Sequence, residues 1–151
     1  MINTRFSAKF NKITRFFNFS GVVDKSDLPA YVRQYIKKEQ ILTIYKTSRD
    51  YGVFTDKKIV LFDNKGKTKQ IYTIPYKSIS NPSICFNEDS AELNLLLDSG
   101  FPVSLKFVNM TGNDKLRLRV LYICMDKLVN DQEPVAEDMK NLITDNLRLD
   151  K

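Results

Sequence analysis

The sequence of 151 residues has no histidine and no tryptophan, and it has only two cysteines. Without histidine the chain cannot form a Ser-His-Asp or Cys-His nucleophile pair, and it lacks the side chain that most often acts as a general base near neutral pH. Cys85 and Cys124 lie far apart among apolar neighbours, so we expect two buried free thiols. A zinc site would need these lone thiolates together with carboxylates, which is an unusual ligand set. We therefore predict no metal site and no cofactor.

Glycine is also sparse. The five glycines are scattered singly, so the chain has no glycine-rich loop that could hold a phosphate group. Carboxylate pairs are the remaining route to catalysis, but no acidic residue lies in a recognisable motif. We predict that the protein is not an enzyme and that it has no small-molecule substrate.

Long apolar runs are missing as well. No stretch approaches the ~18 consecutive apolar residues that a transmembrane helix requires. The N-terminus lacks the apolar core of a secretory signal, because lysine and arginine recur through it. We therefore expect a cytoplasmic protein. The mixture of lysine, asparagine and isoleucine would suit a low-GC Gram-positive bacterium or one of its phages.

The net charge of +6 is unevenly distributed along the chain. Residues 1–23 contain four cations and no acid, whereas residues 126–151 contain seven acids and four bases. The basic N-terminal segment and the acidic C-terminal segment indicate two surfaces that bind different partners, or that bind each other.

Within the basic N-terminal segment, residues 4–19 are predicted to form an amphipathic helix. Four apolar side chains follow the spacing i, i+4, i+7 and i+11, which places them in one stripe of a helix: Phe6, Phe10, Ile13 and Phe17. The four cations fall together on an adjoining face: Arg5, Lys9, Lys12 and Arg15. A second helix is predicted over 27–38, capped by Ser26 or Asp27, with Pro29 in its first turn.

Between residues 41 and 108 the apolar period changes to two, which is typical of strands. Seven short strands are predicted, with a tight turn around Gly66. They cover residues 41–45, 51–55, 59–62, 70–74, 83–87, 91–97 and 103–108. Seven strands joined by turns every few residues indicate a small barrel or sandwich around one apolar interior.

Two helices are predicted after the strands. The first runs from Asn113, its expected N-cap, to residue 129, with Arg117 facing water. Its expected apolar face consists of Leu116, Val120, Ile123, Cys124 and Leu128. After a linker at 130–134, a second amphipathic helix over 135–148 presents an apolar stripe formed by Met139, Leu142, Ile143 and Leu147.

Between residues 45 and 79 several features follow one another in order: Arg49-Asp50, the strand turn Phe54–Lys58, Gly66, and Ile74-Pro75-Tyr76 followed by Ile79. This order resembles that of the bacterial PH (pleckstrin-homology-like) domain family. The resemblance covers about residues 40–129. It implies an α+β, mainly β fold: a PH-like seven-stranded β-barrel capped by a C-terminal helix, without catalytic machinery. Members of that family form ring-like homo-oligomers, so the resemblance also implies self-association.

These patterns divide the chain into three parts: an N-terminal helical extension (1–38), the PH-like barrel domain (39–129), and a C-terminal linker with an amphipathic helix (130–151). The two terminal apolar stripes are the candidate interface with a partner or another subunit. Burying one such side chain contributes ~1.5–3 kcal/mol, whereas an exposed ion pair contributes ~0–1 kcal/mol. Apolar burial therefore provides the binding energy, and charge orients the contact.

Two basic regions are candidate binding surfaces. The cations of the N-terminal helix could attract anionic lipid, although we favour docking of this helix on the barrel or on a neighbouring subunit. Lys57 and Lys58 begin a basic rim on the strand turns. A solvated sheet edge explains this rim better than nucleic-acid binding does. We also prefer a structural ion pair for Arg49 and Asp50 over binding of lipid phosphates.

The sequence thus predicts a cytoplasmic, non-enzymatic module for protein interaction or self-assembly as a homo-oligomer. Its terminal amphipathic helices engage a protein partner or another subunit. The alternative is a peripheral membrane adaptor that binds anionic lipid through the basic N-terminal helix. Nucleic acid is not an expected partner.

Overall fold

The computed structural model describes residues 18–36 and 39–147. The predicted helix over 4–19 lies almost entirely outside these residues. Its last two positions, Asn18 and Phe19, form the short strand β1 (Asn18–Phe19). The helix therefore cannot extend to residue 19, because these two residues pair with a strand of the fold instead.

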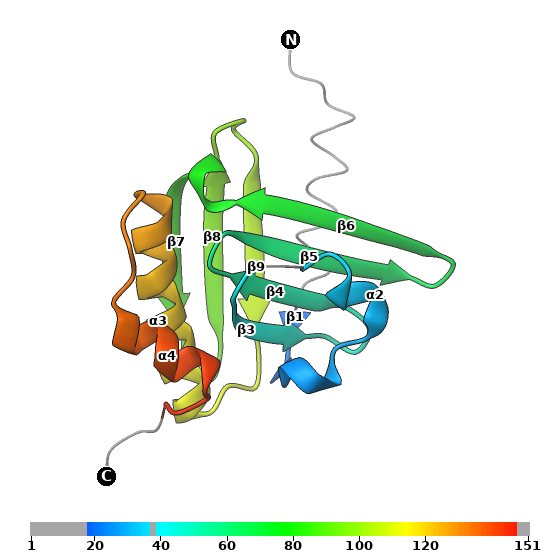
Figure 1. Ribbon diagram of the computed structural model, residues 1–151, viewed down its shortest axis with the longest axis horizontal. Coiled ribbons are helices and arrows are strands. Elements are labelled where there is room, and N and C mark those ends of the chain that lie inside the picture. Colours follow the sequence, from blue (N-terminus) through cyan, green and yellow to red (C-terminus); the bar gives the residue numbers. More distant parts are fainter. Residues whose placement is uncertain (1–17, 37–38, 148–151) are drawn as a thin grey trace.

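The described residues form two sheets, a C-terminal pair of helices and a short helical segment over residues 25–33 (Figure 1). One sheet has five strands in the order β2 (Gly21–Val22), β3 (Ile41–Lys46), β4 (Tyr51–Thr55), β5 (Lys58–Lys65) and β6 (Thr68–Pro75). The other has four strands in the order β1, β9 (Pro102–Phe107), β8 (Ala91–Leu97) and β7 (Ile79–Phe86). The short 3-10 helix η2 (Tyr76–Ser78) joins β6 to β7.

The seven strands β3 to β9 correspond in order to the seven that the period-two pattern predicts, so the predicted PH-like fold is confirmed. The strands are divided between two sheets and do not form one closed barrel. The two short strands β1 and β2 are additional, because each is only two residues long and leaves no periodic pattern in the sequence.

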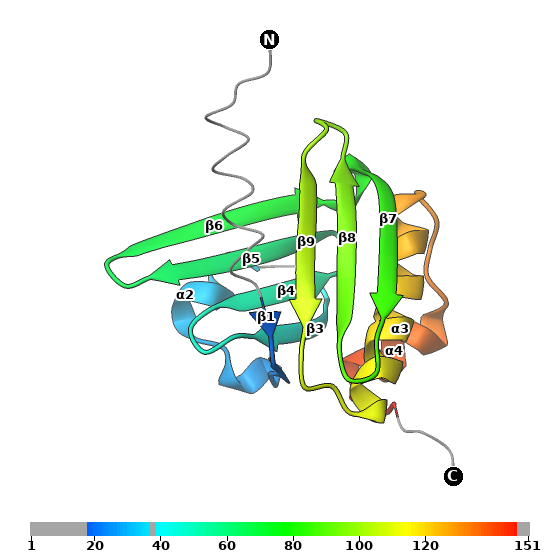
Figure 2. The same cartoon turned by 180° about the vertical axis from the view of Figure 1, so that it is seen from behind.

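Residues 18–22 connect the two sheets at one corner. In β1, Asn18 pairs with Lys106 in the parallel direction, as Figure 2 shows beside β9. In β2, Val22 pairs with Tyr45 of β3 in the antiparallel direction. A single extended segment thus forms ladder hydrogen bonds with an edge strand of each sheet, and it covers backbone groups at both edges.

Two apolar clusters replace the single interior that the sequence predicted. The larger lies between the sheets and includes Phe54, Leu93 and Leu105. The second lies on the outer face of the five-stranded sheet, where Val60 and Phe62 are covered by the N-terminal segment. The central strands are buried on both faces, which explains why their sequences are continuous apolar runs.

The covering segment is less helical than predicted. Instead of a helix over 27–38, the structure has the 3-10 helix η1 (Lys25–Asp27) and the one-turn helix α2 (Ala30–Arg33). Leu28 separates them in an extended conformation with ψ 134°. The residue before a proline is driven out of the helical region, so Pro29 prevents a helix from passing through Leu28.

Helix α3 (Gly112–Val129) has Thr111 as its N-cap, two residues before the predicted cap at Asn113. Thr111 and Asp114 form a reciprocal capping box, with each side chain accepting a hydrogen bond from the backbone N–H of the other. The buried face of α3 includes Arg117, which was expected to face water, whereas Ile123 is 42% exposed. Helix α4 (Ala136–Ile143) is shorter than predicted and packs against α3 and β3.

The two thiols differ in exposure. Cys124 is buried as predicted, but Cys85 is exposed. Cys85 lies on β7, where its neighbours Ile84 and Phe86 point toward the main core, so alternation directs Cys85 to the other face.

Candidate partner-binding cleft

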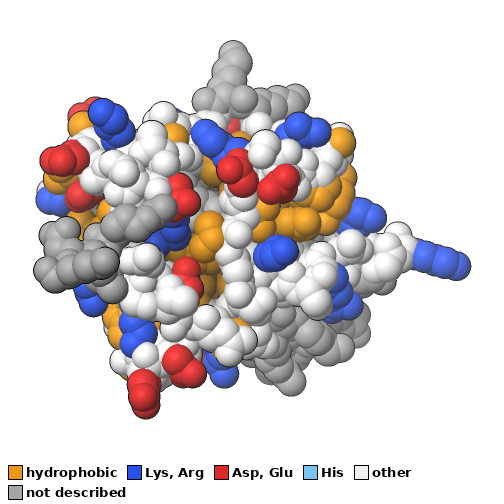
Figure 3. Space-filling model, turned by 90° about the horizontal axis from the view of Figure 1, so that it is seen from below, with side chains coloured by type: hydrophobic (Ala, Val, Ile, Leu, Met, Phe, Trp, Pro, Cys, Tyr) orange, Lys and Arg blue, Asp and Glu red, His pale blue; other side chains and the backbone are white. Residues whose placement is uncertain are grey.

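A cleft of about 660 Å³ lies between segments that are far apart in the sequence. Residues 22–27 form one wall, residues 41–44 of β3 form the floor, and the start of α3 with the end of α4 forms the other wall. Figure 3 views the molecule from below, the side on which these segments lie, and shows apolar side chains exposed in a hollow with charged side chains around it. The volume is within the range of pockets that enclose small ligands or the side chains of a peptide.

The floor of the cleft combines apolar side chains with the buried hydroxyl of Thr43, and Tyr45 lies next to it in the main core. Ile41 contributes apolar surface, next to an irregularity in the β3–β4 register between Ile41 and Thr43, whereas Leu42 is buried in the main core. Thr43 is 4% exposed and Tyr45 is 3% exposed, and neither hydroxyl has a hydrogen-bond partner of good geometry. A buried polar atom without a well-formed hydrogen bond lowers the stability of the fold, and here the two hydroxyls have mainly each other as neighbouring polar groups.

The hydroxyl of Tyr45 stays protonated throughout the neutral range. Burial raises its pKa far above the ordinary value of 10.0, and the nearby guanidinium of Arg117 and the hydroxyl of Thr43 offset only part of this effect. Tyr45 is therefore a neutral donor and acceptor beneath the floor of the cleft, and it takes no part in acid–base chemistry.

The α3–α4 wall is held together by one buried cation. Arg117 on α3 is 7% exposed, and its guanidinium pairs with the carboxylate of Asp145, just beyond α4. The same guanidinium donates to the carbonyl oxygen of Leu142 at 3.5 Å. Asp145 has a φ of 54°, a conformation that often ends a helix. Arg117 thus fixes the C-terminal end of α4 beside the cleft.

Acidic groups predominate around the cleft. Among the residues that the structure describes, the lining contains four carboxylates and two cations, a net charge of −2: Asp24, Asp27, Asp114 and Asp145 against Lys25 and Arg117. Asp24 accepts hydrogen bonds from the backbone and hydroxyl of Ser26, both at 3.0 Å, and these bonds hold its pKa below the ordinary value. The rim therefore remains negatively charged at neutral pH and favours a cationic group.

Three of the predicted interface residues line this cleft, namely Leu142, Ile143 and Leu147. Leu142 is itself buried, at 2% exposure, so the stripe of α4 packs largely on its own chain. Met139 packs against the main core. The other predicted interface and basic residues lie outside the described residues: Phe6, Phe10, Ile13, Phe17, Arg5, Lys9, Lys12 and Arg15.

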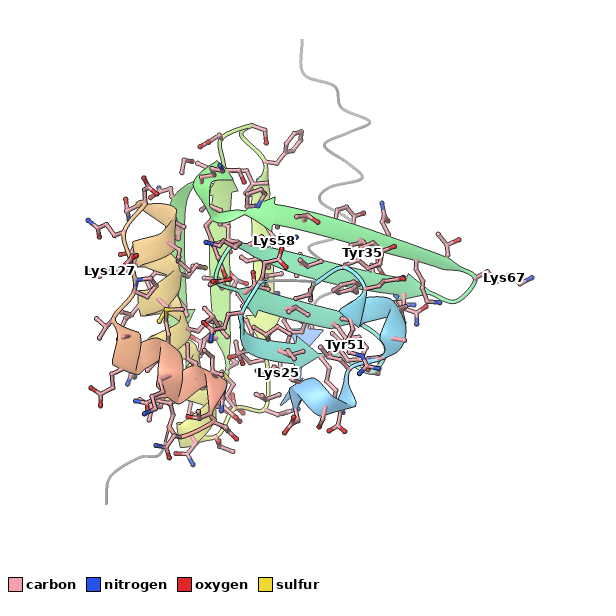
Figure 4. All side chains as sticks on the ribbon, viewed as in Figure 1. Lys25, Tyr35, Tyr51, Lys58, Lys67 and Lys127 are labelled. Atoms are coloured by element: carbon pink, nitrogen blue, oxygen red, sulfur yellow. The ribbon has the colours of Figure 1, made fainter. Side chains whose placement is uncertain are left out.

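The predicted basic rim on the turns lies elsewhere. Lys58 is partly buried and pairs with Glu39 at 2.8 Å, whereas Lys57 is exposed. Figure 4 shows Lys67 at the far tip of the β5–β6 hairpin, remote from Lys25 on the cleft side. Lys57, Lys58 and Lys67 thus do not converge on one site.

The predicted pair of Arg49 and Asp50 is present in the structure. The guanidinium of Arg49 lies 3.6 Å from Asp50 and 3.8 Å from the buried carboxylate of Asp63. Asp50 also accepts a hydrogen bond from the backbone N–H of Asn64 at 2.8 Å. These contacts join the β3–β4 loop to β5, which is the structural role that the sequence analysis preferred.

Sequence reasoning missed the polar groups of the cleft. Arg117 could have been assigned to the buried face, because Arg117, Leu121, Cys124 and Leu128 follow the spacing i, i+4, i+7 and i+11. Thr43 gave no such signal, since a threonine on a strand usually finds a partner. Within the described ranges no three metal-ligating side chains come together, and none of the helices there could cross a bilayer.

The fold defines the class of this protein: a mainly β, PH-like architecture of two sheets followed by a C-terminal helix. The model of the bacterial PH domain family matches residues 9–116. Because this match covers well over half of the chain, the protein belongs to the bacterial PH domain family. The match also includes residues 9–38, most of the predicted N-terminal helical extension (1–38). The proposed three-part division of the chain stays a prediction.

A curated relative matches part of the chain. A stretch of 52 residues is 40% identical to the uncharacterized protein YjqA of Bacillus subtilis strain 168. This alignment covers 32% of the present chain and 42% of YjqA, so the chain matches less than half of that protein's length.

Two solved structures have a similar fold. A DUF1696-family protein with a pleckstrin-homology domain from Shewanella loihica PV-4 is 26% identical, with a TM-score of 0.55 over 75% of this chain and 98% of that one. A PH-domain-containing protein from Exiguobacterium sibiricum is 18% identical, with a TM-score of 0.53 over 72% of this chain and 61% of that one. The second similarity concerns the fold alone.

Proposed function

We propose that this protein is a non-catalytic binding module that docks a cationic amphipathic protein segment in the cleft between residues 22–27, β3, α3 and α4. The observation that carries the proposal is the combination, in one cleft, of exposed apolar side chains such as Ile41 and Ile143 with described charged side chains whose net charge is −2. Membership of the bacterial PH domain family supports a binding role.

The cleft suits one face of a helix. An amphipathic helix places apolar anchors into a groove at i, i+3, i+4 and i+7 while its charged residues meet the rim. Ile41 and Ile143 provide apolar contacts, and the carboxylates of Asp24 and Asp27 can pair with lysine or arginine on the segment. Apolar burial supplies most of the affinity, and the opposite charges speed association and select the orientation.

The charge of the cleft argues against the membrane adaptor as the role of this surface. Anionic lipid attracts clusters of lysine and arginine at a membrane surface. Among the described residues that line the cleft, the carboxylates outnumber the cations, so these residues would repel an anionic bilayer. Binding of this surface to anionic vesicles would therefore contradict the proposal.

The test uses the full chain and a designed helical peptide with leucine at i, i+4, i+7 and i+11 and lysine at the exposed positions. A matched peptide with glutamate in place of lysine is the control. We expect the lysine peptide to shift the backbone NMR resonances of Asp27, Thr43 and Ile143, and we expect the glutamate peptide to bind at least about tenfold more weakly.

Two outcomes would overturn the proposal. In one, the lysine peptide leaves the cleft resonances unchanged at concentrations at which it is fully helical. In the other, the protein binds neither peptide but co-sediments with phosphatidylserine vesicles. The substitutions Asp24→Asn and Asp27→Asn together should lower the affinity of the protein for the lysine peptide. Asp98→Asn, on a distant exposed turn, should leave this affinity unchanged.

A further inference from the structure

We infer that the outer edge of β6 binds an extended, acidic segment of another protein, which joins the five-stranded sheet as a sixth strand. This edge is separate from the cleft, and the inference goes beyond the proposed function. It is carried by the open backbone groups of β6, by the half-buried side chains along the strand, and by the charge of residues 64–78.

Strand β6 is the last strand of its sheet. Among the described residues it pairs only with β5, and Figure 1 and Figure 2 both show it at the outer margin of the five-stranded sheet. The strand is eight residues long. An edge of this length presents a row of backbone N–H and C=O groups with which another chain can pair.

The hairpin turn determines which of these groups point outward. Residues 66–67 form a two-residue turn, so the residues that flank it, Lys65 and Thr68, are a hydrogen-bonded pair. Bonded and non-bonded pairs alternate along an antiparallel ladder. Every second residue of β6 therefore turns its backbone N–H and C=O away from β5. These residues are Lys69, Ile71 and Thr73.

Two observations agree with this alternation. Asn64 on β5 lies opposite Lys69, and its backbone N–H donates to Asp50 at 2.8 Å, on the side away from β6. Pro75 lies opposite Lys58, at a position where a backbone N–H would point outward. Proline has no such group, so the ladder between β5 and β6 loses no hydrogen bond there.

The edge is open, and apolar side chains accompany it on both faces. The outward groups of Lys69, Ile71 and Thr73 have no partner within residues 18–36 and 39–147. Ile71 is half-buried and packs against the second apolar cluster, whereas Tyr72 packs against the main core on the other face. A strand added beside β6 therefore extends both clusters and pairs the open backbone groups.

Charge determines which kind of strand fits. Residues 64–78 contain four lysines and no acidic residue. The Nζ atom of Lys69 lies 5.2 Å from the centre of the Tyr31 ring, and Lys67 lies at the tip of the hairpin (Figure 4). An acidic segment places opposite charges across the new pair, whereas a second copy of β6 would bring like charges together. The lysines thus disfavour pairing of two copies and select an acidic partner.

The register of an antiparallel segment follows from the outward residues. One residue of the segment lies opposite each of them, on the same face of the sheet. A β-branched residue fits opposite Thr73, an aliphatic residue opposite Ile71, and glutamate or aspartate opposite Lys69. In the direction of the segment's own chain, the expected pattern is therefore β-branched, any residue, aliphatic, any residue, acidic.

The experiment uses the full chain and a short synthetic strand peptide that places threonine, valine and glutamate at the three positions of this pattern. In the free protein we expect the outward amides of Lys69, Ile71 and Thr73 to exchange rapidly with solvent. With the peptide bound they should exchange at least about tenfold more slowly. The amides of Gln70 and Tyr72 face β5 and should be protected in both states.

Two N-methylated peptides test whether the peptide joins as a strand. Methylation of the valine amide, which faces β6, should weaken binding by about tenfold or more, because one hydrogen bond is lost and the methyl group blocks the approach. Methylation of the next amide, which faces away from β6, should leave the affinity within about threefold.

Charge substitutions test the selection of an acidic segment. Lys69→Glu should lower the affinity for the strand peptide by about two- to fivefold. Lys25→Glu makes the same change of charge on the cleft side, remote from the hairpin, and should not lower it. A strand peptide with lysine in place of glutamate should bind more strongly to Lys69→Glu than to the natural chain.

Other results would overturn the inference. If the outward amides are already protected in the free protein, the edge is covered and cannot accept a segment. If both methylated peptides bind equally well, the peptide does not join as a strand. If the glutamate and lysine strand peptides protect the edge equally, charge does not select the partner. Each of these results leaves binding of the designed helical peptide in the cleft unaffected, so failure here is distinguishable from failure of the proposed function.

Discussion

The ring of Phe19 lies directly against the backbone of Gly52. A Cβ atom at position 52 would come within 2.5 Å of Cζ of Phe19, a distance that no real contact allows. Phe19 belongs to β1, at the corner where residues 18–22 join the two sheets, and it packs on Tyr45 and Phe107 with ring centroids 6.0 and 5.4 Å apart. Glycine at position 52 thus permits the N-terminal segment to close this corner.

Substitution of Gly52 by alanine should therefore destabilise the protein. Forcing an extra methyl group into a packed site usually costs about 1–3 kcal/mol, although alanine is otherwise preferred to glycine in a strand. Urea denaturation measures the change. Gly21→Ala is the control, because a Cβ there would meet only the flexible side chain of Lys46 at 3.6 Å. Equal losses of stability in the two variants would show that the contact with Phe19 does not determine the cost of a Cβ atom at position 52.

The buried thiol of Cys124 gives a prediction about alkaline pH. Burial, assisted by the nearby charge of Asp138, raises the pKa of Cys124 from its ordinary value of 9.0 to about 11. Between these two values the unfolded chain loses the proton while the folded protein keeps it. The resulting contribution to stability is complete below pH 9.0 and declines as the pH rises toward about 11.

Urea denaturation across this pH range should show the decline, and Cys124→Ala should reduce its slope. The substitution also creates a small cavity, but that cost is independent of pH. The remaining slope reports the other titrating groups of the chain. If both proteins show the same slope, the thiol does not contribute.

The strand pattern could be predicted because it depends on local alternation. Residues such as Val103 and Leu105 point inward at every second position, and this period identifies a strand without knowledge of its neighbours. Alternation says less about strands that are buried on both faces. The run from Ile59 to Phe62 indicated a strand, but it did not reveal that the segment containing Leu28 and Val32 forms a second core over it.

The cleft could not be predicted, because it is formed by tertiary packing. Asp27, Thr43, Arg117 and Ile143 belong to four segments, and no periodicity relates them. The apolar stripe of α4 was visible in the sequence, but only the structure shows that Leu142 packs inward while Ile143 lines the cleft.

Thr43 and Thr55 offer a matched pair of substitutions. Both are buried threonines on neighbouring strands, but the hydroxyl of Thr55 donates to the carbonyl of Lys58 at 3.0 Å and accepts from two backbone N–H groups. Thr55→Val should destabilise the protein by about 1–3 kcal/mol, because those groups lose their partner. Thr43→Val removes an oxygen without a well-formed bond, so it should leave stability unchanged or raise it by about 1 kcal/mol.

The binding measurement shows whether Thr43 has a functional role. If the hydroxyl bonds to the bound segment, Thr43→Val should lower the affinity for the designed lysine peptide several-fold. The same variant should show unchanged or higher stability. An isothermal titration of both proteins measures this difference. Unchanged affinity would mean that the buried hydroxyl is unrelated to binding.

Arg117 and Asp145 yield a prediction about one end of a helix. The guanidinium is buried, but the side chain of Asp145 is 66% exposed, so water already weakens their attraction. Asp145→Asn should lower the global stability only slightly, by about 1 kcal/mol or less. Its local effect should be larger, because α4 has no side-chain hydrogen bond at its start and depends on Arg117 at its end.

Hydrogen exchange is the suitable measurement for that local effect. In Asp145→Asn the amides of residues 140–147 should exchange faster, while those of α3 and β3 keep their rates, because the end of α4 can detach without global unfolding. Asp131→Asn is the matched control: Asp131 also has a positive φ, 57°, and is exposed after a helix, but the structure gives it no ion pair with a buried cation. The lysine peptide should also bind more weakly to Asp145→Asn, because Ile143 and Leu147 line the cleft on the segment that Arg117 holds in place. Faster exchange throughout the molecule would instead show that Arg117 stabilises the whole fold and that α4 does not open separately.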